Sequence, residues 1–96
     1  MLSHADAMLK HTVKRFNERF KKEDFTYKSK NYGTVDFTEV VVNCIVNAPK
    51  KGKYVRDAGG NRSLFKVEVC KEVKPVYVIW DKNHGVPATV LTGKMV

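Results

Sequence analysis

The chain has 96 residues, enough for one domain with a modest hydrophobic core and too few for two lobes with a cleft between them. Its composition, 43% hydrophobic and 29% charged residues, is typical of a soluble globular protein rather than a disordered one. No apolar run approaches the ~20 residues of a membrane span, and the N-terminus lacks a signal-peptide pattern. We therefore expect a cytoplasmic protein, with no membrane partner, that forms a single domain over residues 1–96.

The formal net charge of +8 is spread over the whole chain. Lysine and arginine exceed aspartate and glutamate by three in residues 1–50 (nine against six) and by five in residues 51–96 (nine against four). Such a distribution indicates a basic surface made by the folded domain rather than a detachable tail. Nucleic acid is the usual partner of such a surface, because neutralising phosphates releases counterions. The alternative is a basic protein without such a partner.

The two cysteines, Cys44 and Cys70, lie in apolar stretches and lack the spacing of metal ligands. We expect buried, reduced thiols, although the sequence alone is also compatible with one disulfide. No cysteine or histidine grouping has the spacing of a zinc site, and there is no glycine-rich phosphate loop. The sequence therefore predicts neither a metal nor a nucleotide cofactor.

Residues 3–22 are predicted to form an amphipathic helix. Ser3 can cap it, and Asp6 is an acid placed favourably at the positive helix end. Apolar residues then recur at intervals of three and four, giving one apolar face. That face comprises Ala5, Leu9, Thr12, Val13, Phe16 and Phe20.

A polar stripe runs along the same helix, off the apolar face. His11, Arg15 and Arg19 recur every four residues, about one helical turn apart. An imidazole beside fixed cations suits chemistry on a phosphodiester. It is equally an ordinary decoration of an exposed helix, and the sequence does not separate the two interpretations.

Residues 23–35 show neither a helical nor a strand period, and we predict a connector with a turn at Gly33. Aromatic residues alternate with lysines in this stretch. They either stack on bases while the lysines hold phosphates or, as is commoner in loops, attach the connector to the domain. The residues are Phe25, Tyr27 and Tyr32 with Lys28 and Lys30.

Residues 36–48 are predicted to form a second helix. Asp36 can cap it and Glu39 can reach back to the cap. The many β-branched residues would also suit a buried strand, but the cap and the length favour a helix. Pro49 is expected to end the element in either case.

The second half of the chain shows strand patterns. Strands are predicted at 53–57, 62–70, 76–80 and 88–92, with a loop at 81–87 before the last. Residues 76–80 are apolar on both faces, which marks the central strand. The prediction is an α+β fold, with two N-terminal helices packed on one face of a C-terminal antiparallel sheet of about four strands. The other face of the sheet is expected to remain open.

With these elements in order, the chain resembles the RelE-type endoribonuclease superfamily. The residues concerned are the His-x-x-x-Arg-x-x-x-Arg pattern at 11–19, the acid-capped helix at 36–48 and the strands at 53–57, 76–81 and 88–92. Within the superfamily, the pattern is most similar to phage RegB-type mRNA endoribonucleases and to small domains of unknown function that share the first helix. Each motif is short, and the order of the elements carries most of the resemblance.

The resemblance implies a metal-independent endoribonuclease of phage host-takeover or toxin type. In such enzymes the ribose 2′-hydroxyl attacks the adjacent phosphate of single-stranded mRNA, leaving a 2′,3′-cyclic phosphate. The RNA can be free or bound to a ribosome, and an antitoxin or host protein is a possible further partner. The alternative is a non-catalytic module of the same fold that binds RNA or inhibits a host protein.

The resemblance also implies roles for individual residues. By position, His11 is the general acid or base, Arg15 holds the scissile phosphate, and Arg56 and Thr92 are weaker site candidates on the sheet. Family members of the RegB type carry a further histidine in the second helix, which this chain lacks. We nominate His84 in its place, a solvated loop histidine being the alternative, and His4 lies one heptad before His11 near the helix end. We expect RNA to contact the cations Lys14, Arg19, Lys53, Arg62 and Lys66.

Overall fold

The first helix, α1 (His4–Arg19), begins where the sequence provides a cap. The Ser3 Oγ accepts a hydrogen bond from the Asp6 backbone N–H at 3.1 Å, which confirms the predicted N-terminus. The helix ends when Phe20 turns to extended backbone, slightly earlier than predicted. The computed structural model describes residues 3–96, so the first two residues of the predicted domain lie outside the described part.

The predicted connector at 23–35 is wrong. A short 3₁₀ turn, η1 (Lys22–Phe25), leads into a hairpin of strands β1 (Thr26–Ser29) and β2 (Gly33–Asp36). Gly33 follows the turn with a φ of +75°, a conformation that favours glycine. The strands were not recognisable because most of their residues are exposed on both sides of the ribbon, so no apolar alternation was needed.

The predicted second helix is divided in two, so residues 3–96 contain three α-helices rather than two. Helix α2 (Thr38–Val46) is followed by the single turn α3 (Ala48–Lys51), with Pro49 in its first turn. Proline has no N–H to donate, and at this position none is required, so Pro49 begins a helix instead of ending one. The N-cap of α2 is Phe37 rather than the predicted Asp36, although the Asp36 carboxylate accepts hydrogen bonds from the Thr38 backbone at 2.9 Å and from the Thr38 hydroxyl.

The predicted four-strand antiparallel sheet is confirmed. Its strands are β3 (Lys53–Asp57), β4 (Arg62–Val67), β5 (Val76–Asp81) and β6 (Val86–Leu91), in the order β3-β4-β5-β6. Strand β4 ends before the predicted residue 70, and β6 begins before residue 88. Pro87 lies within β6, where an edge strand tolerates a residue without an N–H.

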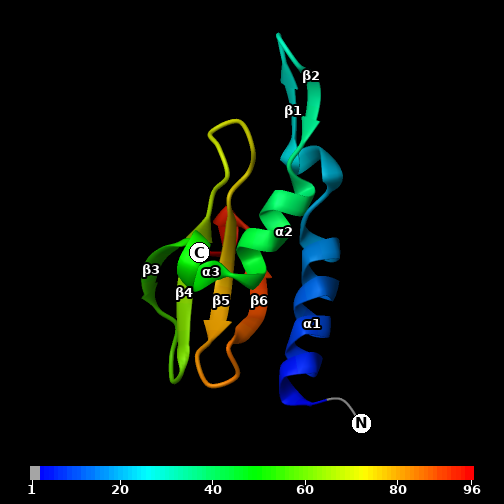
Figure 1. Ribbon diagram of the computed structural model, residues 1–96. Coiled ribbons are helices and arrows are strands. Elements are labelled where there is room, and N and C mark those ends of the chain that lie inside the picture. The colour runs from blue at the N-terminus through cyan, green and yellow to red at the C-terminus, as the bar shows by residue number, and fades with distance from the viewer. Residues whose placement is uncertain (1–2) are drawn as a thin grey trace.

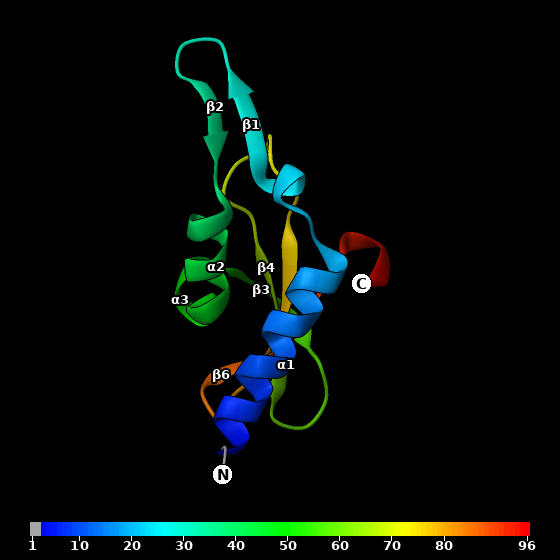
Figure 2. The same ribbon diagram turned by 90° about the vertical axis from the view of Figure 1, so that its right-hand side faces the viewer.

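The prediction that the helices pack on one face of the sheet holds for α2 and α3 but is wrong for α1. Figures 1 and 2 show α2 and α3 over one face of the sheet and α1 running beside the edge strand β6. The Thr12 hydroxyl donates to the Pro87 carbonyl at 2.9 Å, and the Arg19 Nη1 donates to the Val90 carbonyl at 2.7 Å. Thr12 and Arg19 are seven residues apart, about 10.5 Å along a helix, and their partners Pro87 and Val90 are three residues apart, about 10 Å along a strand. Because the two spacings match and both increase along the chain, α1 and β6 run in the same direction.

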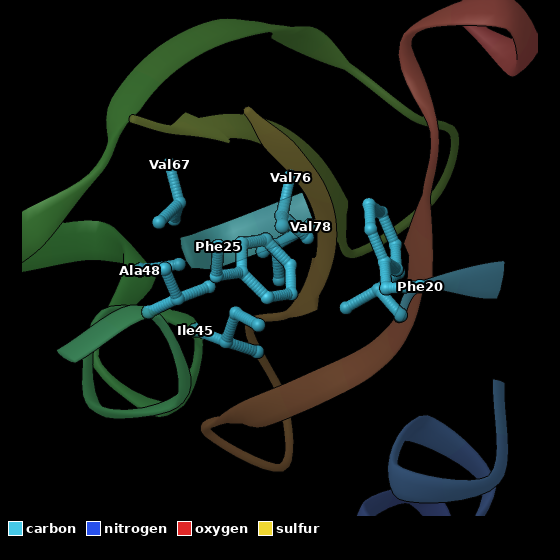
Figure 3. Close-up of a cluster of buried hydrophobic side chains, with 9 residues drawn as sticks. Phe20, Phe25, Ile45, Ala48, Val67, Val76 and Val78 are labelled. Atoms are coloured by element: carbon cyan, nitrogen blue, oxygen red, sulfur yellow. The ribbon is translucent and has the colours of Figure 1, made fainter. Parts of the chain in front are cut away.

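The hydrophobic core lies between the sheet and the elements that cover its inner face, the face toward α2 and α3. Phe25 is 1% exposed and lies among side chains from α2, α3 and the strands (Figure 3). The labelled neighbours are Phe20, Ile45, Ala48, Val67, Val76 and Val78. Phe25 therefore attaches the β1–β2 hairpin to the domain, as the commoner interpretation of that aromatic residue predicted.

The thiols of Cys44 and Cys70 are free, as predicted, and both are half-buried rather than buried. None of the helices within residues 3–96 is long and apolar enough to cross a membrane.

Candidate active site

The register of the sheet separates its two faces. Residues directly opposite one another on neighbouring strands point to the same side. Phe65, Val78 and Val90 are register partners that belong to or pack on the core, so their row faces inward. The adjacent row, Lys66, Tyr77 and Leu91, therefore lies on the outer face, which α2 and α3 leave uncovered.

The outer face is basic along β3 and β4. Lys53 is the register partner of Lys66, and Arg56 is the partner of Leu64 on the same side. Arg62 also alternates onto this side and opposes Asp81. We call Lys53, Arg56, Arg62 and Lys66 the basic face. All four were nominated from the sequence, and the fold brings them together on two neighbouring strands.

A buried carboxylate at the end of β5 organises the loop that follows. One oxygen of Asp81 accepts the His84 backbone N–H at 3.0 Å and lies 3.0 Å from the His84 ring Nδ1. Its other oxygen is 3.5 Å from the Arg62 Nε. Hydrogen bonds from the His84 backbone and ring, with a smaller contribution from Arg62, lower the pKa of Asp81 below its ordinary value. The carboxylate thus fixes the orientation of the imidazole.

The local sequence explains how His84 returns to Asp81. Gly85 adopts a φ of +64° and donates its N–H to the Asp81 carbonyl at 2.9 Å, which closes a tight turn. An aspartate at the start of such a turn bonds backbone N–H groups a few residues later. His84 is thus an exposed turn residue, as the alternative interpretation expected, but its ring is held by Asp81.

A second imidazole lies beside the first. The ring centroids of His4 and His84 are 5.7 Å apart, with an angle of 36° between the ring planes. His4 opens α1 and His84 precedes β6, and these two elements run parallel, so their starting ends meet. We call His4 and His84 the histidine pair. Two imidazoles at this separation can act as base and acid on one substrate.

His11, the histidine favoured by the sequence pattern, does not join this pair. It follows His4 by seven residues, about 10.5 Å along the helix. Its side chain is exposed and makes no hydrogen bond or ion pair within the described residues. His84 therefore meets His4 rather than His11.

Both histidines of α1 nevertheless lie on the same flank of the helix, together with Arg15. The opposite flank lines an apolar groove of about 250 Å³ against α2. At about 100° per residue, the residues bonded to β6 lie between the two flanks. The histidine flank therefore borders the outer face of the sheet. The groove residues on α1 include Leu9, Val13 and Phe16.

The cations of α1 differ in their availability. The Arg15 Nη1 forms an ion pair with the Glu18 Oε2 at 2.8 Å at the surface, an interaction of small net strength. Arg19 donates to the Val90 carbonyl, so its guanidinium fastens the helix to β6. Lys14 is exposed. Arg15 and Lys14, together with the exposed Lys10, therefore remain accessible to a ligand on this helix.

Arg56 and Thr92 lie away from the histidine pair. Arg56 is on β3, the edge strand opposite β6. Thr92 follows β6 and precedes a final 3₁₀ turn, η2 (Gly93–Met95), at the end where Arg19 meets Val90. The nominated catalytic residues therefore do not form one cluster.

The sequence reasoning missed Asp81 and gave His4 little weight. A signal for Asp81 was present, because an aspartate three residues before a histidine-glycine step favours a turn that the carboxylate closes. His4 offered no comparable signal, since its partner is eighty residues away in the chain. Within residues 3–96, no three histidine, cysteine, aspartate or glutamate side chains are arranged to hold a metal ion.

No protein-family model matches the chain, and neither a curated protein nor a solved structure matches it. The resemblance to RelE-type endoribonucleases therefore stays a prediction, and the candidate site depends on its geometry alone.

Proposed function

We propose that the protein is a metal-independent endoribonuclease that cleaves single-stranded mRNA and leaves a 2′,3′-cyclic phosphate. The observation that carries the proposal is the histidine pair, with one imidazole held by a buried carboxylate and an arginine beside it. Self-cleavage of RNA needs a group that takes a proton, a group that donates one and a cation for the phosphorane charge. These residue types are present within one cluster.

The contact with Asp81 suggests the role of His84. An ionised carboxylate only accepts hydrogen bonds, so the Nδ1 that faces it carries the proton and the Nε2 is left with a free lone pair. Neutral His84 then takes the proton of the ribose 2′-hydroxyl. The O2′ attacks phosphorus, the bond from phosphorus to O5′ breaks, and protonated His4 donates its proton to the departing O5′.

The remaining residues supply binding. Arg62 lies next to Asp81, and its planar guanidinium can hold two phosphate oxygens. The other cations of the basic face continue from Arg62 across β4 and β3, and RNA bound along them reaches the histidine pair. Affinity from such contacts falls steeply as salt increases.

The basic face also favours a second candidate function, because its cations would hold RNA whether or not the histidines react. In that case the protein is a non-catalytic RNA-binding module, or one that inhibits a host protein. An activity assay separates the two functions. Either function is compatible with a phage host-takeover or toxin role in which an antitoxin or host protein is a further partner.

The proposal is tested by incubating the purified protein with single-stranded RNA in EDTA and analysing the ends of the fragments. We expect cleavage with cyclic phosphate ends, and no cleavage when the ribose at the cut site is replaced by 2′-deoxyribose. The assay is repeated with mRNA on translating ribosomes. Intact RNA in both settings would refute the nuclease and leave the binding module.

A further inference from the structure

We infer that the β1–β2 hairpin is an arm that binds single-stranded RNA, with bases stacked on Tyr27 and Tyr32 and phosphates neutralised by Lys28 and Lys30. The inference rests on the proposed function in taking RNA as the ligand. It adds a binding surface separate from the histidine pair and the basic face.

The arm projects from the body of the domain. Figures 1 and 2 both show β1 and β2 extending beyond the helices and the sheet, with the turn at the far tip. Its ladder is regular, from Thr26 opposite Asp36 to Ser29 opposite Gly33. A two-stranded ribbon without a covering layer has no core of its own. Its exposed side chains are therefore available to a ligand.

The base of the arm is fixed to the domain. Phe25 is buried, and its carbonyl accepts the Phe37 backbone N–H at 2.9 Å. Asp24 binds Lys74 twice, through its carbonyl to the Lys74 backbone N–H at 3.1 Å and through its carboxylate to the Lys74 Nζ at 3.2 Å. An arm anchored in this way presents its side chains in a defined position, which lowers the ordering entropy lost on binding.

Both tyrosines of the arm expose ring surface to solvent, Tyr32 more than Tyr27. Tyr32 is 84% exposed and Tyr27 is 38% exposed. Neither ring stacks on another aromatic residue within residues 3–96, whereas Phe25 stacks on Phe16 and Phe20. Aromatic rings left in solvent offer platforms for bases, and each stacked base contributes about 1–3 kcal/mol.

The charge of the arm favours a polyanion. No aspartate or glutamate lies between residues 25 and 35. The ion pairs of the described residues do not include Lys28 or Lys30, whereas Lys22 at the base pairs with Asp36 at 3.7 Å. Cations without acidic neighbours are available for phosphates. An acidic peptide would supply anions for the lysines but no bases to stack on the tyrosines.

The register favours a single strand over a duplex. Tyr27 and Val35 share one side of the ribbon, and Lys28 and Thr34 share the other. A flexible single strand that crosses the ribbon can place a base on one side and a phosphate on the other. A duplex keeps its bases stacked internally and cannot do so.

The test is fluorescence anisotropy with a short labelled single-stranded RNA whose riboses carry 2′-O-methyl groups, which prevents cleavage. We expect the double variant Tyr27→Ala/Tyr32→Ala to bind about tenfold more weakly or worse, from the loss of stacking. Tyr27→Phe/Tyr32→Phe should retain the affinity, because the rings remain. Lys28→Ala/Lys30→Ala should weaken binding and reduce the slope of log affinity against log salt by about 1.4.

Tyr54→Ala is the matched control, since Tyr54 is 54% exposed but lies on β3 away from the arm. It should bind RNA as the wild type does, and duplex RNA should not distinguish the tyrosine variants from the wild type. Unchanged single-strand affinity in the double tyrosine variant would overturn the arm while leaving the nuclease intact. A loss of affinity in a protein that cleaves no RNA would support the arm and refute the nuclease. No RNA binding by the wild type would overturn both.

Discussion

The two histidines nominated from the sequence, His84 and His11, are both exposed but differ in what holds their rings. His84 is held through its ring and backbone by Asp81 and lies 5.7 Å, centroid to centroid, from a second imidazole. His11 is exposed on α1, with no such partner within the described residues. Groups that orient an imidazole and fix its tautomer prepare it for proton transfer. The four-residue spacing of His11, Arg15 and Arg19 places cations near His11, but none of the described contacts holds the His11 ring in position.

The largest expected effect is that of His84→Ala. Removing one proton-transfer group should lower the cleavage rate by about 10²–10⁴-fold, because no other oriented imidazole faces His4. The rate is measured on a defined single-stranded RNA under single-turnover conditions. RNA affinity, measured on a non-cleavable RNA, serves as the control and should change little. A rate within threefold of the wild type would remove His84 from the site.

Asp81→Asn should have a smaller effect on cleavage, since the His84 imidazole remains. Only the carboxylate that fixes its tautomer and orientation is lost. We expect a reduction of kcat by about 10–100-fold with KM nearly unchanged, as for other groups that orient a catalytic or metal-bound histidine. Steady-state kinetics measure the two constants. An increase in KM alone would instead assign Asp81 a role in binding through Arg62.

The same carboxylate predicts a pH effect on stability. The folded-state pKa of Asp81 is lowered, so its contribution to stability is present above the ordinary value near 3.8 and lost as the pH falls through the folded pKa. Asp24 and Asp36 also have lowered pKa values and act in the same direction. Thermal unfolding between pH 6 and about 3 should therefore show a smaller acid loss in Asp81→Asn than in the wild type. Equal acid losses would show that the carboxylate is not held as described.

Thr12→Val tests the alignment that brings the histidine pair together. The hydroxyl bond to Pro87 is buried, and its loss leaves the carbonyl without a partner, so unfolding should become easier by about 1–3 kcal/mol. Because this bond sets α1 in step with β6, the cleavage rate should fall several-fold as well. Chemical denaturation and single-turnover cleavage measure the two effects. A destabilised variant with a full cleavage rate would show that alignment of His4 does not depend on this contact.

The smallest expected effect is that of His11→Ala. The ring makes no described contact, so the cleavage rate should change less than about threefold and stability should stay within about 0.5 kcal/mol. The family resemblance predicts the opposite, an abolished activity. Measuring His11→Ala beside His84→Ala thus decides between resemblance and geometry.

Much of the fold followed from local patterns, and the exceptions have physical causes. Strand β5 was recognisable because a central strand is apolar on both faces, and β3 because turn residues bound it. The β1–β2 hairpin was missed because a ribbon exposed on both sides needs no alternation. The sequence predicts that Pro49 ends a helix, because sequence alone does not distinguish the residue after one helix from the first turn of the next.

The candidate site was less predictable than the fold, because it depends on how elements pack. Arg15 and Arg19 are equivalent in the sequence pattern, yet only Arg19 donates to a backbone carbonyl of β6. The meeting of His4 with His84 follows from the parallel run of α1 and β6, which no local pattern encodes. The basic face was easier to anticipate, since alternation along a strand assigns Arg62 and Lys66 to one side.

The proposed roles of His4 and His84 are tested by comparing wild-type protein with His4→Ala, His84→Ala and His11→Ala on one single-stranded RNA in EDTA, with the fragment ends identified. We expect fragments with 2′,3′-cyclic phosphate ends from the wild type and His11→Ala, and almost none from the other two variants. Loss of cleavage in His11→Ala with retention in His84→Ala would contradict these roles.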